Sequence, residues 1–195
     1  MISAEKYISF IEYLSSHLSK NRFYHSVSVE KECRLLAHRY GADDCACCIA
    51  GLLHDVTRGL SLDEQLTLVN RYDIITDDFQ RSSANLLHAV TAPAVVQELF
   101  SINDADILDA IRYHTTGKPD MSLICKIIFI ADFCEPTRQY SFSHEVRKLA
   151  HESIDKAVTT ALDLTITHLH EKNVPIHEDT LNAFAFYSKE KNLKI

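Results

Sequence analysis

Apolar residues recur along the chain with the spacing of helices that bury one face. In the first segment, residues 4–18 ("AEKYISFIEYLSSHL"), Tyr7, Phe10, Ile11 and Leu14 fall on a single stripe. Positions three and four apart lie on one side of an α-helix, so this pattern predicts an amphipathic helix rather than a strand.

Similar patterns, bounded by capping residues, glycine or proline, predict helices along most of the remaining chain. They are expected at about Tyr24–Tyr40, Asp44–Asp55, from a capping box at Ser61–Glu64, within Ser83–Phe100 as one or two short helices with Pro93 near a start, at Asp104–Tyr113, at Ser122–Cys134, as one long helix at Val146–Lys172, and after Pro175. Only "CKIIFIAD" resembles a strand, and its length and flanks favour a buried helix. We therefore expect an all-α fold, a compact single-domain bundle of about ten helices over residues 1–195.

The composition agrees with one globular domain. Of 195 residues, 46% are hydrophobic and only four are glycine and four proline, and we find no linker or low-complexity segment. No apolar run approaches the roughly 20 residues of a membrane span, and the start "MISAEKYISF" lacks the basic leader and apolar core of a signal peptide. We expect a cytoplasmic protein with no membrane partner.

Charge and cysteine content narrow the function classes further. The net charge of -7 argues against a binder of duplex nucleic acid, which needs a basic face. It leaves room for a small polyphosphate, which a few arginines and metal ions can hold locally. The six cysteines lie inside apolar helical patterns and are expected to be buried small hydrophobes in a reducing compartment. A zinc site from "CACC" is disfavoured because no second cysteine pair follows at finger spacing.

One polar pair interrupts the apolar pattern. In "GLLHDVTRG", residues 51–59, His54 and Asp55 follow an almost wholly apolar helix. Burying an imidazole and a carboxylate together is costly unless they are paired, hydrogen-bonded or bound to a metal.

Four more polar residues stand at comparable positions. They are His25 after "NRFY", His88 after "NLL", His114 after "IRY" and Asp132 within "IIFIAD". Taken alone, a buried aspartate such as Asp132 usually caps a helix or pairs with arginine. Taken together with His25, His54 and Asp55, it completes a set of two imidazoles and two carboxylates, which suits iron, manganese or another borderline divalent ion.

These residues resemble the metal site of the HD-domain phosphohydrolase superfamily. Within it, "RFYHSVSV", "AGLLHDVTR", "NLLHA", "AIRYHTTGKPDMSLICKIIFIADFCEPTR" and "PIHEDT" look, in that order, like the bacterial YqeK-type subgroup of symmetrical diadenosine tetraphosphate hydrolases. The resemblance covers about Arg22 to Thr180. It implies a metal-binding core over about residues 22–138, followed by C-terminal helices over about 146–190.

The resemblance also implies roles for matching positions. The implied metal ligands are His25, His54, Asp55 and Asp132, and the implied catalytic residues are Asp55, His88 and His114, the two histidines serving as second-metal ligands or as phosphate donors. Substrate contacts are expected from Arg22, Arg58, His88, His114, Thr116, Arg138, Ile176, His177 and Thr180. Two of these have simpler readings, because Arg58 could be a solvated surface charge and Thr116 part of an ordinary turn before Pro119.

This chain departs from the subgroup pattern at three places. Ala89 stands where glycine is expected, Arg58 where lysine is frequent, and Phe133 where a polar residue is common. None of the three departures removes an implied ligand.

The activity implied is metal-dependent hydrolysis of diadenosine tetraphosphate into two ADP. Its expected cofactor is a divalent transition metal, iron first, as one or two ions, with no organic cofactor. The expected partner is a dinucleoside polyphosphate or ADP, and the sequence leaves assembly open, with a homodimer as one option. The alternatives are another HD-type nucleotide phosphohydrolase, acting on deoxynucleotides, guanosine tetraphosphate or a cyclic dinucleotide, or a non-catalytic metal- and nucleotide-binding regulatory module.

Overall fold

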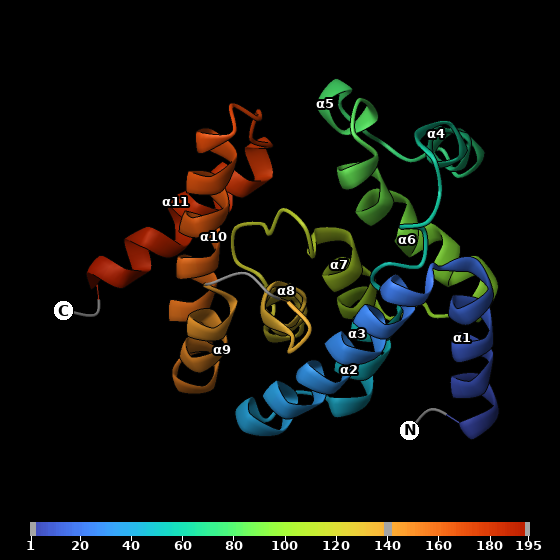
Figure 1. Ribbon diagram of the computed structural model, residues 1–195, viewed down its shortest axis with the longest axis horizontal. Coiled ribbons are helices and arrows are strands. Elements are labelled where there is room, and N and C mark those ends of the chain that lie inside the picture. Colours follow the sequence, from blue (N-terminus) through green and yellow to red (C-terminus); the bar gives the residue numbers. More distant parts are fainter. Residues whose placement is uncertain (1–2, 139–141, 194–195) are drawn as a thin grey trace.

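The computed structural model describes residues 3–138 and 142–193, without the side chains of residues 190–193. In this part of the chain there are eleven helices and no strand, so the all-α expectation is confirmed (Figure 1). The helices are α1 Ala4–His17, α2 Lys20–Tyr40, α3 Asp44–Leu53, α4 Leu62–Arg71, α5 Asp78–Arg81, α6 Ala84–Phe100, α7 Ala105–Tyr113, α8 Leu123–Cys134, α9 Ser143–Glu152, α10 Ile154–Glu171 and α11 Glu178–Leu193. Within the described residues, none of them is long and apolar enough to cross a bilayer.

Several helix ends lie where their capping residues predict. The Ser61 side chain accepts a hydrogen bond from the backbone of Glu64, whose carboxylate accepts one in return, so the capping box that begins α4 is present. Ser122 caps α8 by accepting from the Cys125 N–H. Gly41 ends α2 with φ +69°, a left-handed conformation that glycine adopts without steric cost.

The single long helix expected over residues 146–172 is wrong. The helix is interrupted at Ser153, whose backbone is extended with φ -157° and ψ 114° and separates α9 from α10. Its backbone N–H donates to the Leu149 carbonyl, while its hydroxyl accepts from the Lys156 N–H. A serine side chain can replace backbone hydrogen bonds in this way. The periodic apolar pattern continues on both sides of Ser153, so the pattern alone does not predict the interruption.

Other boundaries differ from expectation as well, and α2 begins at Lys20, four residues before the expected start at about Tyr24. α6 is one continuous helix with Pro93 inside it, although proline removes a backbone donor; its many buried side chains provide the compensating packing. α3 ends at Leu53, so His54 and Asp55 lie in the turn that follows. The short helix α5, capped by Asp77, was not expected at all.

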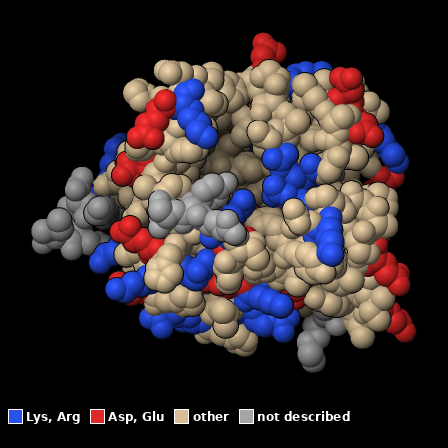
Figure 2. Space-filling model, in the orientation of Figure 1, with Lys and Arg blue, Asp and Glu red and all other residues tan. Residues whose placement is uncertain are grey.

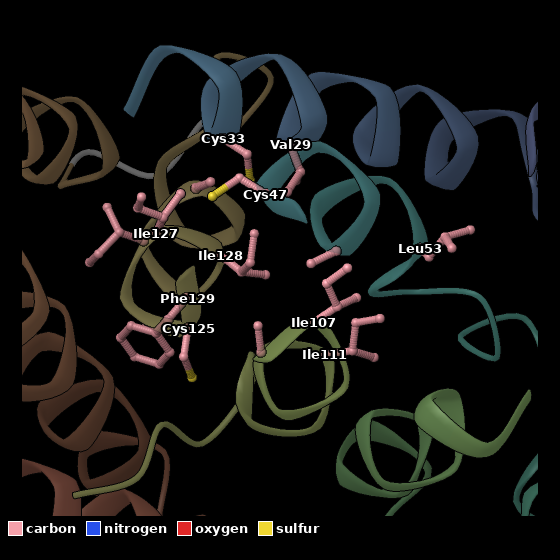
Figure 3. Packing of buried hydrophobic residues seen from close by; sticks show 14 of the residues in the cluster. Val29, Cys33, Cys47, Leu53, Ile107, Ile111, Cys125, Ile127, Ile128 and Phe129 are labelled. Carbon is pink, nitrogen blue, oxygen red and sulfur yellow. The ribbon is translucent and has the colours of Figure 1, made fainter. Parts of the chain in front are cut away.

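The core is organised around α8. In Figure 1 this helix is seen nearly end-on in the middle, with α9–α11 on one side and α2, α3 and α7 on the other, and it contacts α2, α3, α7, α9 and α10. Figure 3 shows Ile127 and Ile128 of α8 beside Val29, Cys47 and Ile111, all fully buried. Burying a side chain of this size contributes about 1.5–3 kcal/mol, and this packing fixes the position of the end of α8.

The cysteines behave as expected of small hydrophobes. All six are free thiols, and only Cys45 is not buried. Burial raises the pKa of the Cys47 thiol to about 12, so it stays protonated and unreactive near neutral pH.

Candidate metal centre

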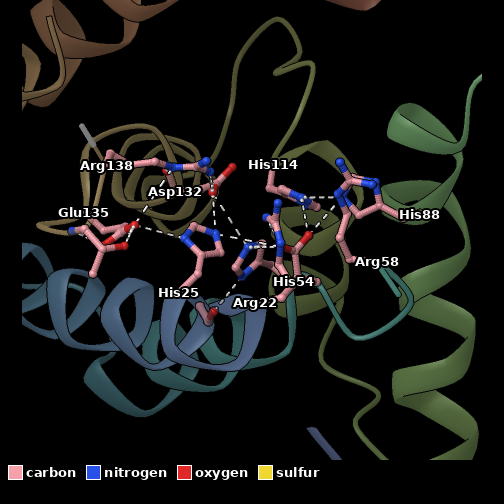
Figure 4. A network of polar contacts seen from close by, with 12 residues as sticks. Arg22, His25, His54, Arg58, His88, His114, Asp132, Glu135 and Arg138 are labelled. Carbon is pink, nitrogen blue, oxygen red and sulfur yellow. Dashed lines mark hydrogen bonds and ion pairs between the residues drawn. The ribbon is translucent and has the colours of Figure 1, made fainter. Parts of the chain in front are cut away.

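Six buried or nearly buried polar side chains from five parts of the chain meet at one place (Figure 4). They are His25 of α2, His54 and Asp55 from the turn after α3, His88 of α6, His114 at the end of α7, and Asp132 in the last turn of α8. We call these six residues the histidine–aspartate cluster. The structure thus brings together every residue predicted as a metal ligand or catalytic group.

On one side of the cluster, two histidines face Asp132 Oδ1 and Asp55 Oδ2. Nε2 of His25 lies 3.0 Å from Asp132 Oδ1 and 3.8 Å from Asp55 Oδ2. Nε2 of His54 lies 3.4 Å from Asp55 Oδ2 and 3.8 Å from Asp132 Oδ1. Two imidazole nitrogens and two carboxylate oxygens therefore face a common point.

The other side uses the second oxygen of Asp55. Nε2 of His88 lies 3.0 Å from Asp55 Oδ1, and Nε2 of His114 lies 3.7 Å from it. The two Nε2 atoms are 3.1 Å apart. Asp55 is shared by two sets of converging ligand atoms, as a carboxylate bridging two ions would be.

The hydrogen bonding within the cluster shows that these residues fit a cation. The Nδ1 atom of His54 donates to the Gly51 carbonyl, 2.7 Å away, and that of His114 donates to the Ile111 carbonyl, also at 2.7 Å. A neutral ring that donates from Nδ1 presents a lone pair at Nε2. The buried Nε2 atoms of His25 and His54 make no hydrogen bond of good geometry in the described part of the chain.

Lone pairs directed at carboxylate oxygens repel them unless a positive ion lies between. The directions in which the pKa values of Asp55 and His114 are shifted agree with this reading. Burial alone would raise the pKa of Asp55, but the adjacent His54 and His88 outweigh it and hold that pKa well below its ordinary value. Burial, together with the same two histidines, lowers the pKa of His114 to about 3. Ionised carboxylates and neutral imidazoles are the forms that bind metals.

Glu135 is a site residue that the sequence did not reveal. It is fully buried and accepts hydrogen bonds from His25 Nδ1 at 3.0 Å, from the Thr137 N–H at 2.6 Å and from the Thr137 hydroxyl at 2.5 Å. Burial opposes its ionisation, but these donors outweigh burial and lower the pKa of Glu135 to about 2. The available signal was its place three residues after Asp132, one turn further along; its partner His25 is 110 residues away.

Two of the predicted arginines contact the cluster directly. Arg22 Nη1 lies 2.8 Å from Asp55 Oδ2, and Arg138 Nη2 lies 2.5 Å from Asp132 Oδ1. Arg58 is half-buried and instead donates to the side chain of Asn85 at 2.8 Å. Arginine at such places can donate paired hydrogen bonds to phosphate oxygens.

The remaining predicted substrate contacts lie further along the chain. Thr116 is buried, and its hydroxyl donates to the Gly117 carbonyl within its own turn. His177 is buried, with Nε2 2.9 Å from Asp77 Oδ2, which links the start of α11 to the start of α5. Thr180 is buried one turn after His177, and Ile176 is half-buried. Contact of these four residues with a substrate stays a prediction.

The cluster opens to solvent on the side of Arg22 and Arg138. Their side chains are 31% and 23% exposed, against 17% for Asp132 and 2% for Asp55. A cleft of about 550 Å³ lies there, lined by both arginines, His25 and Glu135. Figure 2 shows that this face of the molecule is hollowed near its middle and that Lys and Arg side chains gather around the hollow. An anion therefore meets positive charge on entering.

Comparison with known proteins agrees with this geometry. The HD domain family matches residues 22–137. The chain is 38% identical over 174 residues to a protein of Halalkalibacterium halodurans named symmetrical bis(5'-nucleosyl)-tetraphosphatase, covering 89% of this chain and 92% of the relative. It is 35% identical to a protein of the same name from Bacillus subtilis, covering 86% and 89% respectively.

A solved structure shows the same fold. It is a crystal structure from Clostridium acetobutylicum described as a "predicted HD superfamily hydrolase involved in NAD metabolism". The TM-score is 0.92 and the identity 33%, over 97% of this chain and 99% of the other. This chain belongs to the HD-domain family of metal-dependent phosphohydrolases. Within that family, it is similar over most of its length to two proteins named symmetrical bis(5'-nucleosyl)-tetraphosphatase.

Proposed function

We propose that this protein hydrolyses dinucleoside tetraphosphates symmetrically and converts diadenosine tetraphosphate and water into two ADP. The observation that carries the proposal is the complete histidine–aspartate cluster, with arginines at its opening, in a chain 38% identical to a symmetrical tetraphosphatase. A merely structural metal site would need neither the extra histidines nor an arginine-lined opening.

Iron is the ion that we propose for the cluster, as one or two ions per chain. His25, His54, Asp55 and Asp132 would hold the first, and Asp55 with His88 and His114 the second or the phosphates. A divalent ion at such a site lowers the pKa of a coordinated water and withdraws negative charge from phosphate oxygens.

The chain's own residues bind and orient the phosphates. Arg22 and Arg138 stand at the opening, where they can donate to phosphate oxygens and stabilise charge that develops during cleavage. Arg58 adds a further positive charge, and Thr116, Ile176, His177 and Thr180 are the proposed contacts for one nucleoside half. Burial lowers the pKa of His114 to about 3, so this histidine stays neutral near pH 7 and does not serve as a strong general acid.

The bond changes balance without a further reactant. Water oxygen bonds to one of the two central phosphorus atoms, and the bond between that same phosphorus and the bridging oxygen breaks. The bridging oxygen leaves with the other ADP, and the two protons of the water pass to solvent or to a terminal phosphate of ADP. The leaving group is ADP, whose terminal phosphate is a weak base, so little proton donation is needed.

Hydrolysis in water enriched in heavy oxygen tests this function. Chromatography should show ADP alone from diadenosine tetraphosphate, and mass spectrometry should find one heavy oxygen in half of the ADP molecules. Formation of AMP and ATP would show asymmetric cleavage and contradict the proposal. Failure to cleave any nucleotide in a panel, with metal bound, would favour a non-catalytic module.

We also propose a cytoplasmic location, where nucleotides are abundant and six free thiols stay reduced. A homodimer is the assembly that we propose to test first, by light scattering of the metal-loaded protein.

A further inference from the structure

A second, smaller pocket lies beside the histidine–aspartate cluster. Its volume is about 210 Å³, and its apolar walls are Phe133 from the end of α8, Phe142 before α9, and Leu164 and Leu169 of α10. The rings of Phe133 and Phe142 have centroids 5.7 Å apart and planes inclined at 34°. All four side chains are half-buried, so part of this surface is accessible. We call it the Phe133 pocket.

The Phe133 pocket shares a wall with the cluster. Asp132 and Arg138 line it as well, and Arg138 also lines the cleft at the opening of the cluster. Phe133 directly follows Asp132 in α8, and adjacent helical side chains diverge by about 100°. One residue therefore faces the cluster while the next faces the pocket, so a molecule held at the opening can reach into both.

The walls of the pocket suit a planar, uncharged ring with an anionic tail. Aromatic rings offer faces on which a base stacks, aliphatic side chains exclude water from it, and the guanidinium at the shared wall suits a phosphate. A slightly larger apolar pocket near α1 makes a useful contrast. Tyr7 and Phe10 line it together with Glu30, Asp44 and Arg34, but it shares no lining residue with the cleft at the opening of the cluster.

We propose that the Phe133 pocket binds the purine base of one of the two nucleosides of a dinucleoside tetraphosphate. This inference rests on the proposed symmetrical cleavage, which requires a nucleoside on each side of the broken bond. The segment around His177, which was expected to hold one nucleoside, shares no residue with the Phe133 pocket. It follows the C-terminal end of α10, the half of that helix whose Leu164 and Leu169 line the pocket, and it leads into α11. The Phe133 pocket gives the other nucleoside a place next to Arg138.

Steady-state kinetics of the metal-loaded enzyme test the proposal. Phe133→Leu keeps an apolar side chain but removes the ring, and Phe133→Ala removes the wall. Loss of one stacked base costs about 1–3 kcal/mol, so KM for diadenosine tetraphosphate should rise about 5- to 150-fold in both variants. Metal content should not change, and kcat should stay within about twofold. Tyr72→Ala, at the distant end of α4, is the matched aromatic control and should leave KM unchanged.

Tryptophan fluorescence offers a second test, because the chain contains no tryptophan. Phe133→Trp should retain a nearly native KM, and its single indole should be quenched when the metal-loaded protein binds a diadenosine tetraphosphate analogue with a non-cleavable methylene bridge at its centre. Inorganic tetraphosphate, which has no base to stack, should not quench it.

Three results would overturn the inference while leaving the function intact. These are an unchanged KM in Phe133→Leu within an enzyme that still makes two ADP, an indole that does not respond to an inhibitory analogue, or equal quenching by inorganic tetraphosphate. If the wild-type protein makes no ADP, the proposed function itself fails.

Discussion

Asp55 is the residue on which the two halves of the histidine–aspartate cluster depend. Its Oδ2 atom faces His25 and His54, and its Oδ1 atom faces His88 and His114. It also receives the guanidinium of Arg22. Removing this carboxylate takes one ligand atom away from each set.

Asp55→Ala should therefore lower both turnover and bound metal by at least about a hundredfold, since even indirect partners of a metal ligand contribute about 10- to 100-fold. Elemental analysis and nucleotide chromatography measure the two quantities. His38→Ala is the control, because the His38 side chain is 70% exposed and its ion pair with Asp44, at 3.5 Å, lies on the surface. Equal losses in both variants would indicate general fragility instead.

Glu135 contacts a predicted ligand, His25, and acts as a positioning residue for it. By accepting from Nδ1, it keeps the proton there and leaves Nε2 free to bind the ion. Glu135→Ala should weaken metal binding about 10- to 100-fold, and Glu135→Gln, which retains an acceptor oxygen, should weaken it less.

Competition with a metallochromic chelator measures this affinity directly, independently of activity. The exposed Glu145→Gln serves as the control for loss of a negative charge. If Glu135→Ala binds metal as tightly as the wild type, Glu135 does not set the orientation of His25.

At the scale of elements, α9 and α10 show what a capping serine does inside a continuous apolar pattern. Ser153 ends one helix and begins the next, and its hydroxyl accepts from the Lys156 N–H. Ser153→Ala should lower the free energy of unfolding by about 1 kcal/mol, the usual value of an N-cap. Urea titration measures this, with Ser15→Ala, an exposed position inside α1, as the control; kcat should not change. A variant as stable as the wild type would show that the break has another cause.

The same elements show which features of the fold can be predicted from the sequence. Ser61, Ser122 and Gly41 set helix ends through contacts within a few residues, and such local chemistry is readable from the chain. The break at Ser153 is not, because its neighbours keep helical periodicity. Local patterns do not show contacts across long separations. The metal-ligand set was expected from a family resemblance, whereas neither Glu135 beside His25 nor Asp77 beside His177 could be predicted.

At the scale of the whole molecule, one hydrophobic cluster contains buried residues from Phe10 of α1 to Tyr187 of α11. This continuity supports the single domain expected over residues 1–195, which stays a prediction. The histidine–aspartate cluster lies among these helices, so attraction and repulsion among its charged groups change the free energy of unfolding of the entire fold.

Removal of metal should accordingly lower the melting temperature. At free metal 100-fold above its dissociation constant, binding adds about 2.7 kcal/mol to stability, which for a chain of this size is about 5–10 °C. Differential scanning calorimetry before and after chelation, and after metal is returned, measures the shift. Asp55→Ala should melt at the same temperature with and without chelator; a shift as large as that of the wild type would mean that the ion binds elsewhere.

The spread of the cluster along the chain also has a consequence for its biogenesis. His25 leaves the ribosome 107 residues before Asp132. At about 5–20 residues per second, roughly 5–20 seconds separate the first ligand from the last. During that interval the nascent chain carries histidines that can hold an ion only loosely, and any ion captured then can exchange. We therefore expect the identity of the ion to be decided after α8 has emerged, by the metals that the completed helices meet.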